Sequence, residues 1–245
     1  KTHSGFSIRV TAGPFSDPDV RRAMKLAINR DDIVAKILSG FGSVANDQPI
    51  SAAYPYHNPD LPQTVYDPDQ ARALFKKAGV EGTTIPLHVA DTPFTGAVDA
   101  AQLYREHAMA AGVELEVIRE PDDGYWSNIW GKKPFFATKW SGRVNEDAML
   151  SLAYSRESIG GWNETGWDNE AFNTALLAAR GEKDEAKRRE LYWECQRLIH
   201  DDCGLVAPVW ADFLDAASAN VRHGEVASDW ELDGARAAER WWFAA

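Results

Sequence analysis

The stretch TIPLHVA at residues 84–90 decides the fold, because it begins an alternation of strands and helices. This predicted strand is followed by a helical pattern at 95–111 and by VELEVIR at 113–119, in which apolar and polar residues alternate as in a strand. A short helical pattern at 122–131 precedes the next predicted strand, at 135–140. This alternation predicts an α/β fold, in which helices pack against the faces of a sheet.

Two further helices begin with the same capping device. The sequence DPD, at 17–19 and again at 67–69, places a carboxylate before the helix, proline in its first turn and a second acid near the positive end of the helix dipole. We therefore expect helices at 18–29, with a restart that runs to residue 38, and at 67–77. The remaining predicted elements are strands at 6–12 and 205–210, helices at 168–180 and 184–200, and a long loop at 46–66.

The composition limits the class of protein. The chain has 245 residues, which fits one large domain or two small ones. Its formal net charge of −11 argues against a nucleic-acid partner, because binding phosphate groups requires a basic surface. No apolar run reaches the roughly 20 residues that a membrane-spanning helix needs. Residues 1–5 do not read as a signal peptide, and we expect one to have been removed.

Motifs for catalysis or cofactor binding are absent from the sequence. GFGSVA at 40–45 matches a dinucleotide-binding pattern, but it follows a predicted helix, whereas the pyrophosphate needs a turn from strand to helix. The sequence has no GxxxxGK[ST], GxSxG or HExxH motif, no CxxC pair and no histidines at metal-ligand spacing. We therefore expect no catalytic residue, no cofactor and no metal ion.

The two cysteines, Cys195 and Cys203, stand eight residues apart. On one continuous helix they would lie about 12 Å apart, too far for a disulfide bond. Asp201, Asp202 and Gly204 indicate that the helix stops between them, so that a turn could bring Cys203 back. The sequence allows either a disulfide bond or two buried free thiols.

Tryptophan is unusually frequent, with ten in the chain. Five of them fall close together in the sequence: Trp126, Trp130, Trp140, Trp162 and Trp167. Burial as a large core side chain is the simpler interpretation of any single one. As a group, however, aromatic rings with polar edges are also what a cleft uses to enclose a small ligand.

Several segments, taken in their order and spacing, carry a resemblance that spans most of the chain. They are PFSDPDVRRAMKLAINRDDIV (14–34), YDPDQARALFKKAG (66–79), KWSGRVNED (139–147), AKRRELYWECQRLIHDD (186–202), VAPVW (206–210) and the ending ERWW (239–242). Together they resemble the extracytoplasmic substrate-binding proteins of peptide-type ABC importers, known as the family 5 type.

The resemblance implies an α/β lobe of the periplasmic-binding-protein type, with a mixed sheet and helices on both faces. In this family a longer chain forms two lobes that close about a hinge. Residues 13–212 would then be the second, C-terminal lobe, and 1–12 and 213–245 would be hinge-crossing and return segments that belong to a first lobe missing from this sequence. That lobe would cover the aromatic end at 241–243, which is otherwise unusual for a complete monomer.

A function follows from the same resemblance. The family captures a small peptide-like or other polar solute between its two lobes in the periplasm, and delivers it to a membrane permease. The chain would therefore be a binding protein and no enzyme.

The resemblance also places the ligand at strand ends and helix starts of this lobe. Peptide-binding members carry an aspartate after the tryptophan of the KWSGRVNED segment, where it pairs with the α-amino group of the peptide, but this sequence has Arg143. A guanidinium offers paired donors to a carboxylate or phosphate and repels an ammonium, so we expect an anionic or hydroxyl-rich ligand group at Arg143, stacked by Trp140 or Trp167. The predicted ligand-binding residues are Thr92, Phe94, Trp140, Gly142, Arg143, Trp162, Asn163 and Trp167.

Other interpretations of these residues stay open at this point. Arg143 could instead form a salt bridge with Glu146 or Asp147, or be fully solvated. Trp126 and Trp130 could line the cleft, or a short helix could pack both of them against the sheet.

Two other classes of function compete with solute binding. Neighbouring acids, such as Asp122 with Asp123 or Glu146 with Asp147, could serve a hydrolase, which needs an acid and a base on either side of one bond. The tryptophans could instead serve a stand-alone module that recognises a carbohydrate or a protein. Turnover of a glycoside or a peptide by the purified chain would favour the hydrolase.

Overall fold

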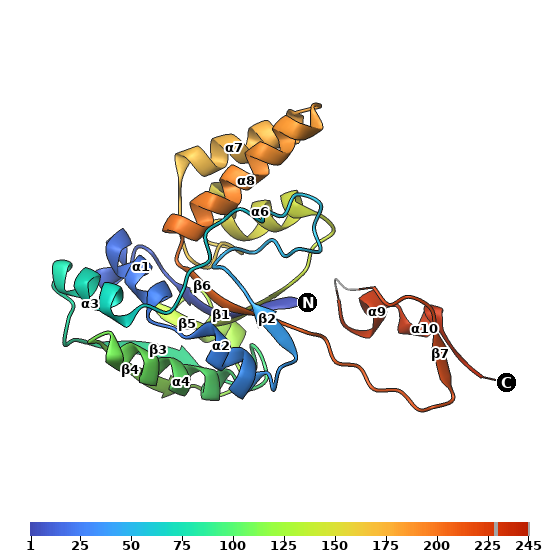
Figure 1. Cartoon of the computed structure of the whole chain (residues 1–245), viewed down its shortest axis with the longest axis horizontal. Coiled ribbons are helices and arrows are strands. Elements are labelled where there is room, and N and C mark those ends of the chain that lie inside the picture. Colours follow the sequence, from blue (N-terminus) through green and yellow to red (C-terminus); the bar gives the residue numbers. More distant parts are fainter. Residues whose placement is uncertain (228–229, 245) are drawn as a thin grey trace.

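A computed structural model describes residues 1–227 and 230–244 of the chain (Figure 1). The strands of its main sheet are β1 (Thr2–Ile8), β2 (Gly42–Val44), β3 (Thr84–Val89), β4 (Glu114–Arg119), β5 (Phe135–Ser141) and β6 (Leu205–Ala211). These six strands lie in the order β2-β6-β1-β5-β3-β4. β3 is parallel to β4 and β5, whereas β1 is antiparallel to β5 and β6, so the sheet is mixed.

Helices cover both faces of this sheet (Figure 1). They are α1 (Pro18–Leu26), α2 (Arg30–Asp32), α3 (Pro68–Lys77), α4 (Ala97–Ala110), α5 (Tyr125–Asn128), α6 (Glu146–Tyr154), α7 (Glu170–Gly181) and α8 (Glu185–Asp202), with short turns η1 (Gly13–Ser16), η2 (Ile33–Ile37) and η3 (Arg156–Ser158). On one face α1, α3 and α4 form the larger core with strand residues such as Phe6 and Leu87. On the other face α6, α7 and α8 enclose a second core that contains Trp140 and Leu205. This arrangement confirms the predicted α/β lobe with a mixed sheet and helices on both faces.

The capping residues act as the sequence predicts. Asp17 accepts a hydrogen bond from the backbone N–H of Asp19 at 2.8 Å, and Asp67 accepts one from that of Gln70, also at 2.8 Å. These bonds satisfy N–H groups that have no partner inside the helix, which is why α1 and α3 begin at the prolines that follow the caps.

The first strand differs from its predicted place. The sequence predicts it at 6–12, but β1 ends at Ile8 and lies inside the sheet, with every one of its residues buried. Phe6 and Ile8 belong to the larger core, and most other positions of the strand are polar. The resemblance assigns residues 1–12 to a first lobe, whereas residues 2–8 complete this sheet. The domain boundaries themselves stay a prediction.

α6 and β2 are among the elements that were not predicted. α6 begins directly after Asn145, whose side-chain oxygen accepts a hydrogen bond from the backbone N–H of Ala148 at 2.8 Å. The helix expected to run to residue 38 is divided into α2 and the π-helical turn η2, and the short strand β2 follows it, antiparallel to β6.

Both cysteines are buried free thiols, so the disulfide alternative is wrong. α8 continues to Asp202, and the backbone N–H of Cys203 still donates to the carbonyl of Ile199 at 3.1 Å. The turn that would bring Cys203 back to Cys195 therefore does not form. Burial raises the pKa of the Cys195 thiol to about 12 and that of Cys203 to about 11, which keeps both in the unreactive thiol form at neutral pH.

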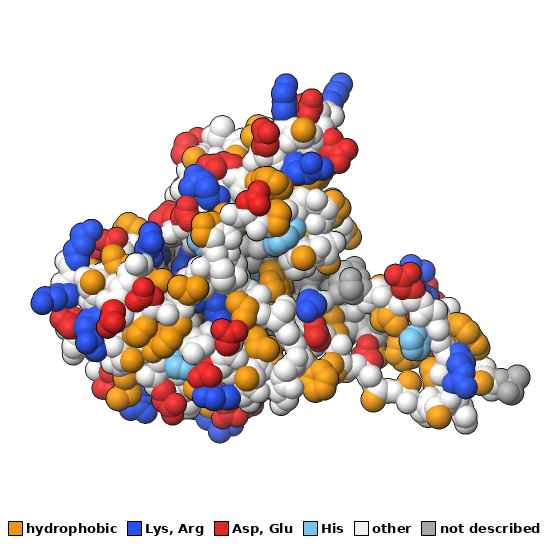
Figure 2. Space-filling view, viewed as in Figure 1, with side chains coloured by type: hydrophobic (Ala, Val, Ile, Leu, Met, Phe, Trp, Pro, Cys, Tyr) orange, Lys and Arg blue, Asp and Glu red, His pale blue; other side chains and the backbone are white. Residues whose placement is uncertain are grey.

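A small C-terminal unit, residues 212–227 and 230–244, follows the body of the protein. It contains β7 (Val221–His223), α9 (Glu231–Ala235), α10 (Ala237–Arg240) and β8 (Trp241–Phe243), and β7 is antiparallel to β8. Figure 1 shows this unit beside the body at the end of a long connection, and Figure 2 shows how narrow the join is. Its aromatic residues are poorly covered, since Trp242 is 55% exposed and Phe243 79%.

Candidate functional site

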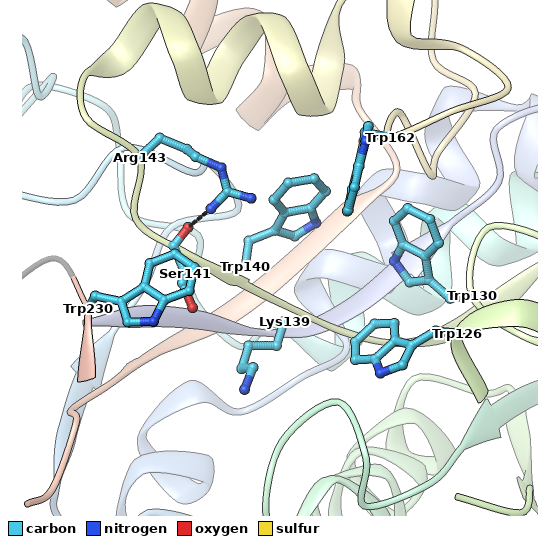
Figure 3. Close-up of a pocket in the computed structure, with 8 residues that line it drawn as sticks. All are labelled: Trp126, Trp130, Lys139, Trp140, Ser141, Arg143, Trp162 and Trp230. Carbon is cyan, nitrogen blue, oxygen red and sulfur yellow. Dashed lines mark hydrogen bonds between the residues drawn. The ribbon is translucent and has the colours of Figure 1, made fainter. Parts of the chain in front are cut away.

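A hollow of about 480 Å³ opens where β5 ends (Figure 3). Indole rings make up most of its wall, and two cationic side chains and one hydroxyl complete it. The residues that line it are Trp126, Trp130, Lys139, Trp140, Ser141, Arg143, Trp162 and Trp230. An apolar concave surface with a few placed polar groups is the usual form of a small-molecule site.

Four of these indoles form a continuous series of edge-to-face contacts. The ring centroids of Trp126 and Trp130 lie 6.3 Å apart, those of Trp130 and Trp162 5.7 Å, and those of Trp162 and Trp140 5.9 Å. The planes of each pair are inclined at 64–67°. Each such pair contributes roughly 0.5–1.5 kcal/mol beyond the burial of its surface, so the rings hold one another in place.

The helix α5 and the turn that follows it carry Trp126 and Trp130 to the hollow. Its Tyr125 is buried and donates a hydrogen bond to the carbonyl of Ala137 on β5 at 2.8 Å. Ile129 is also buried against the sheet, while Trp126 stays 45% exposed at the hollow. Of the two alternatives for Trp126 and Trp130, the lining of a cleft is therefore the one that the structure shows, and Tyr125 provides the packing against the sheet.

A buried carboxylate, Glu164, lies behind the indole wall. Ser7 on β1 donates a hydrogen bond to its Oε1 at 2.5 Å, and Thr138 on β5 donates one to its Oε2 at 2.9 Å. Burial raises the pKa of Glu164, although these hydroxyls and the indole N–H groups of Trp130 and Trp140 favour its ionised form. The carboxylate thus joins two strands to the loop that carries Trp162.

Arg143 is held firmly by its own surroundings. Its backbone N–H donates to the hydroxyl of Tyr54 at 2.6 Å, and that hydroxyl donates to the Arg143 carbonyl at 2.9 Å. Its Nη1 donates to the carbonyls of Ser141 and Gly142 at 2.9 and 3.0 Å, and the guanidinium carbon lies 5.2 Å from the ring centroid of Trp140 (Figure 3). Burial lowers the pKa of Arg143, but a guanidinium stays charged at neutral pH.

The alternative salt bridge of Arg143 with Glu146 or Asp147 is wrong. Glu146 is buried, and its Oε1 accepts a hydrogen bond from the backbone N–H of Tyr56 at 2.6 Å. Asp147 forms an ion pair with Arg180 at 2.7 Å. Within residues 1–227 and 230–244, no carboxylate lies within salt-bridge distance of Arg143.

The structure brings half of the predicted ligand-binding residues together. Trp140, Arg143 and Trp162 line the hollow, and the carbonyl of Gly142 orients the guanidinium.

Two other predicted residues lie in the interior. Trp167 is only 2% exposed, and its indole N–H donates to Asp202 at 2.7 Å. Asn163 donates to the carbonyls of Ser155 and Trp167 at 3.1 and 2.9 Å. The expectation that Trp167 stacks on the ligand is corrected by this burial, since both residues stabilise the loop from inside.

The predicted residues after β3 also lie away from the hollow. The hydroxyl of Thr92 donates to Asp122 at 2.7 Å, which ties two loops together. Phe94 packs on the larger core. Neither residue lines the hollow in this structure.

Some lining residues were missed by sequence reasoning. Lys139 and Ser141 flank Trp140 on β5 and were not among the predicted ligand-binding residues. Trp230 comes from the C-terminal unit, and no spacing rule connects it to the other indoles. Glu164, which lies behind the wall, was not singled out from the sequence either.

Comparison with known proteins adds to this geometry. Residues 2–162 match the family model described as "Bacterial extracellular solute-binding proteins, family 5 Middle". The chain belongs to this family. The resemblance predicted from the ordered segments is thereby confirmed.

Curated relatives of this family 5 chain are longer than it is. It is 29% identical over 200 residues to a protein named "Dipeptide-binding protein" from Pseudomonas aeruginosa. This alignment covers 78% of the chain and 37% of the relative. It is 28% identical over 229 residues to "Glutathione-binding protein GsiB" from Salmonella typhimurium, covering 88% of the chain and 43% of that protein. The chain thus spans about two-fifths of the length of these relatives, which are named as binding proteins and not as enzymes.

Solved structures share the fold of the family 5 chain. The dipeptide binding protein from Pseudoalteromonas sp. SM9913, in complex with Met-Leu, matches 94% of the chain with a TM-score of 0.81 at 20% identity. The oligopeptide-binding protein AppA from Bacillus subtilis, in complex with a nonapeptide, matches 100% of it with a TM-score of 0.79 at 16% identity. In these matches the chain covers 46% and 51% of the other protein.

Among the described residues, no helix is both long enough and apolar enough to span a bilayer. The same part of the chain contains no group of three histidine, cysteine or acidic side chains arranged to hold a metal ion.

Proposed function

We propose that this chain is a ligand-binding lobe of an extracytoplasmic solute-binding protein, which captures a small solute for an ABC importer of the peptide type. The observation that carries the proposal is the hollow of indoles and Arg143 at the end of β5, in a chain that belongs to family 5. Aromatic walls around one oriented cation suit the capture of a small polar molecule.

A first lobe, encoded by further sequence, would complete the site. The matches cover only 37–43% of the curated relatives cited above, which leaves room for a second lobe of similar size. The hollow is open on one side, and the exposed Trp242 and Phe243 offer an apolar surface to a covering partner. On this proposal residues 2–211 form one lobe, and the C-terminal unit belongs with the first.

The ligand would be held as the two lobes close about their hinge, and the closed form would dock on a membrane permease. The site of action is then periplasmic or otherwise extracytoplasmic. Arg143 would meet an anionic or hydroxyl-rich group of the ligand, because the free edge of a guanidinium provides paired donors for such groups.

A hydrolase receives little support from the geometry. Three of the four acids suggested for catalysis are engaged elsewhere: Asp122 accepts hydrogen bonds from Thr92, and Glu146 and Asp147 hold Tyr56 and Arg180. Of the described residues that line the hollow, none is an acid. A glycosidase requires a pair of carboxylates, one on either side of the substrate bond, and the described lining of the hollow does not supply them.

The test is native mass spectrometry of the full-length gene product purified from its host. We expect a small molecule to co-purify with it, and the bound fraction to fall at least about tenfold in Arg143→Gln, because one charge-assisted pair is lost. Arg72→Gln is the matched control, since Arg72 also donates to a backbone carbonyl but lies away from the hollow. A gene product that carries no small molecule and does not associate with a permease would contradict the proposal.

A further inference from the structure

We propose that the hollow accepts an aromatic carboxylate: a flat aromatic ring joined by a short spacer to a carboxylate, with no ammonium group at that end. The proposal rests on the function above, since it names the class of solute to be captured. Charge, ring geometry and spacing around the hollow each point to this class.

The charge of the hollow favours an anion. Two cationic side chains, Arg143 and Lys139, line it, and none of its described lining residues is acidic. Nη1 of Arg143 is taken by two carbonyls, and no hydrogen bond or ion pair engages Nε or Nη2 within residues 1–227 and 230–244. A partly buried guanidinium without an anionic partner is costly, and a ligand carboxylate that meets its free edge removes that cost.

The carboxylates near the hollow are not available to pair with an ammonium group of a ligand. Glu164 sits behind the indole wall, where Ser7 and Thr138 already donate to its two oxygens. Glu146 and Asp147 are engaged by other groups. His3 lies buried near Arg143, and its pKa, lowered to about 3 by burial and by that guanidinium, keeps it neutral. A ligand ammonium would therefore meet only cations and neutral groups.

The walls favour an aromatic ring over a sugar. A sugar ring needs several hydrogen-bond partners around its edge, but among the described residues the non-indole lining consists of Lys139, Ser141 and Arg143. The side chains of Trp130 and Trp140 also favour the ionised form of Glu164 behind the wall. Indoles inclined to one another by about 65° leave faces and edges against which an aromatic ring can pack edge to face.

The distances require a short spacer. The guanidinium carbon of Arg143 lies 5.2 Å from the ring centroid of Trp140, and that centroid lies 5.9 Å from the one of Trp162 (Figure 3). A ring packed against Trp162 and Trp140 is thus one ring width from the cation. A spacer of two or three bonds brings a carboxylate to Arg143 while the ring stays between the indoles.

Matched probes separate these features. The chain, labelled with ¹⁵N at tryptophan, is titrated with 3-phenylpropionate, 3-phenylpropanamide, protonated 3-phenylpropylamine, 3-cyclohexylpropionate and glucuronate, and the indole N–H resonances are followed. We expect 3-phenylpropionate to shift the resonances of the hollow and to bind at least about tenfold more tightly than the amide or the amine, since only it forms a charge-assisted pair. We expect it to exceed the cyclohexyl acid and glucuronate as well, since they lack the aromatic ring.

Variants locate the two halves of the interaction. Arg143→Gln should remove the preference for the acid over the amide, and Arg143→Lys should keep only part of it, because a lysine lacks the planar fork. Trp162→Leu should weaken all aromatic probes, whereas Trp242→Leu is a control of equal exposure, 55% against 54%, outside the hollow.

The outcomes distinguish this inference from the proposed function. The inference is overturned if the amine or glucuronate binds as tightly as 3-phenylpropionate or more tightly. It is also overturned if neither the chain nor the full-length gene product binds any aryl acid. If the full-length protein meanwhile carries a co-purified solute of another class, the proposed function stands and only the ligand class is wrong. Binding of 3-phenylpropionate that Arg143→Gln leaves unchanged also overturns it.

Discussion

Glu164 is the buried carboxylate that holds the residues behind the indole wall together. Its oxygens hold Ser7 and Thr138 from two strands, and the indoles of Trp130 and Trp140 face it. A buried carboxylate that satisfies several donors is costly to ionise, yet removing it would leave those donors unpaired. The arrangement of the indole wall therefore depends on a residue that no ligand touches.

This burial predicts a pH-dependent stability. Because the folded protein raises the pKa of Glu164 above its usual 4.5, the folded state binds more protons than the unfolded state in the range just above that value. The contribution of Glu164 to stability is therefore complete below pH 4.5 and is lost as pH rises through the folded pKa, by at most about 1.4 kcal/mol per pH unit. The buried His3, whose pKa is lowered to about 3, adds the opposite slope to the wild type and to Glu164→Gln alike, so the prediction concerns their difference. In urea unfolding between pH 4 and 8, the free energy of unfolding of the wild type should fall relative to that of Glu164→Gln.

Glu116→Gln serves as the control for that experiment, since Glu116 is exposed on β4. It should follow the wild-type profile. Parallel curves for the wild type and Glu164→Gln would show that Glu164 is not the group responsible.

Among the elements, α6 fixes the segment that presents Arg143. It begins one residue after Asn145, and its first turn holds Glu146 and Asp147, which bind the loop at Tyr56 and the helix α7. The chain between β5 and α6 is thus fastened at both ends.

Removal of the α6 cap should therefore affect both stability and binding. Asn145→Ala leaves the backbone N–H of Ala148 without its partner, which should lower the free energy of unfolding by about 1 kcal/mol and weaken binding of 3-phenylpropionate severalfold. Asp67→Ala removes a comparable cap from α3 and should cost similar stability without changing binding. Urea unfolding and the indole titration measure the two effects, and an equal loss of binding in both variants would contradict the role of α6.

Elements of strong periodicity could be predicted from the sequence, and those decided by tertiary packing could not. Caps and alternation gave α1, α3, β3 and β4 to within a few residues. The sequence placed β1 at 6–12 instead of 2–8, because the first half of the strand, Thr2 to Gly5, is polar and is buried through its neighbouring strands. α6 was overlooked, although Asn145 and two acids preceded a periodic apolar run.

The candidate site divides in the same way. Arg143, Trp140 and Trp162 follow from the order of segments, whereas the local sequence of Trp167 does not reveal whether its ring meets the core or the cleft. Which indoles are exposed depends on contacts between residues that are distant in sequence, such as Tyr125 with Ala137, Trp167 with Asp202 and Glu164 with Ser7. The spacing of residues along the sequence does not predict such contacts.

At the scale of the whole molecule, the body and the C-terminal unit are joined by an exposed segment. Residues 212–220 have no regular structure, and most of them are exposed (Figure 2). Exposed segments of this kind are the preferred sites of proteolysis.

Limited proteolysis of the chain should therefore cut first within 212–220. We expect a stable fragment that ends near Ala211, because β6 is paired on both sides and buried. Mass spectrometry identifies the cut, and circular dichroism tests whether the fragment stays folded. First cleavage inside the body, for example in the loop before α3, would show that the segment is better protected than its exposure suggests.

The inner position of β1 also has a consequence for how the protein folds. Thr2 pairs with Ser141 on β5 and with Ala211 on β6, partners that are far away along the chain. Contacts of such long range slow folding, because the chain must close large loops before they form. During synthesis β1 has no partner until β5 is made, and it can then pair with β5 and join the unit from β3 to β5. The other edge of β1 stays open, and β2 stays unpaired, until β6 has left the ribosome and inserted between them.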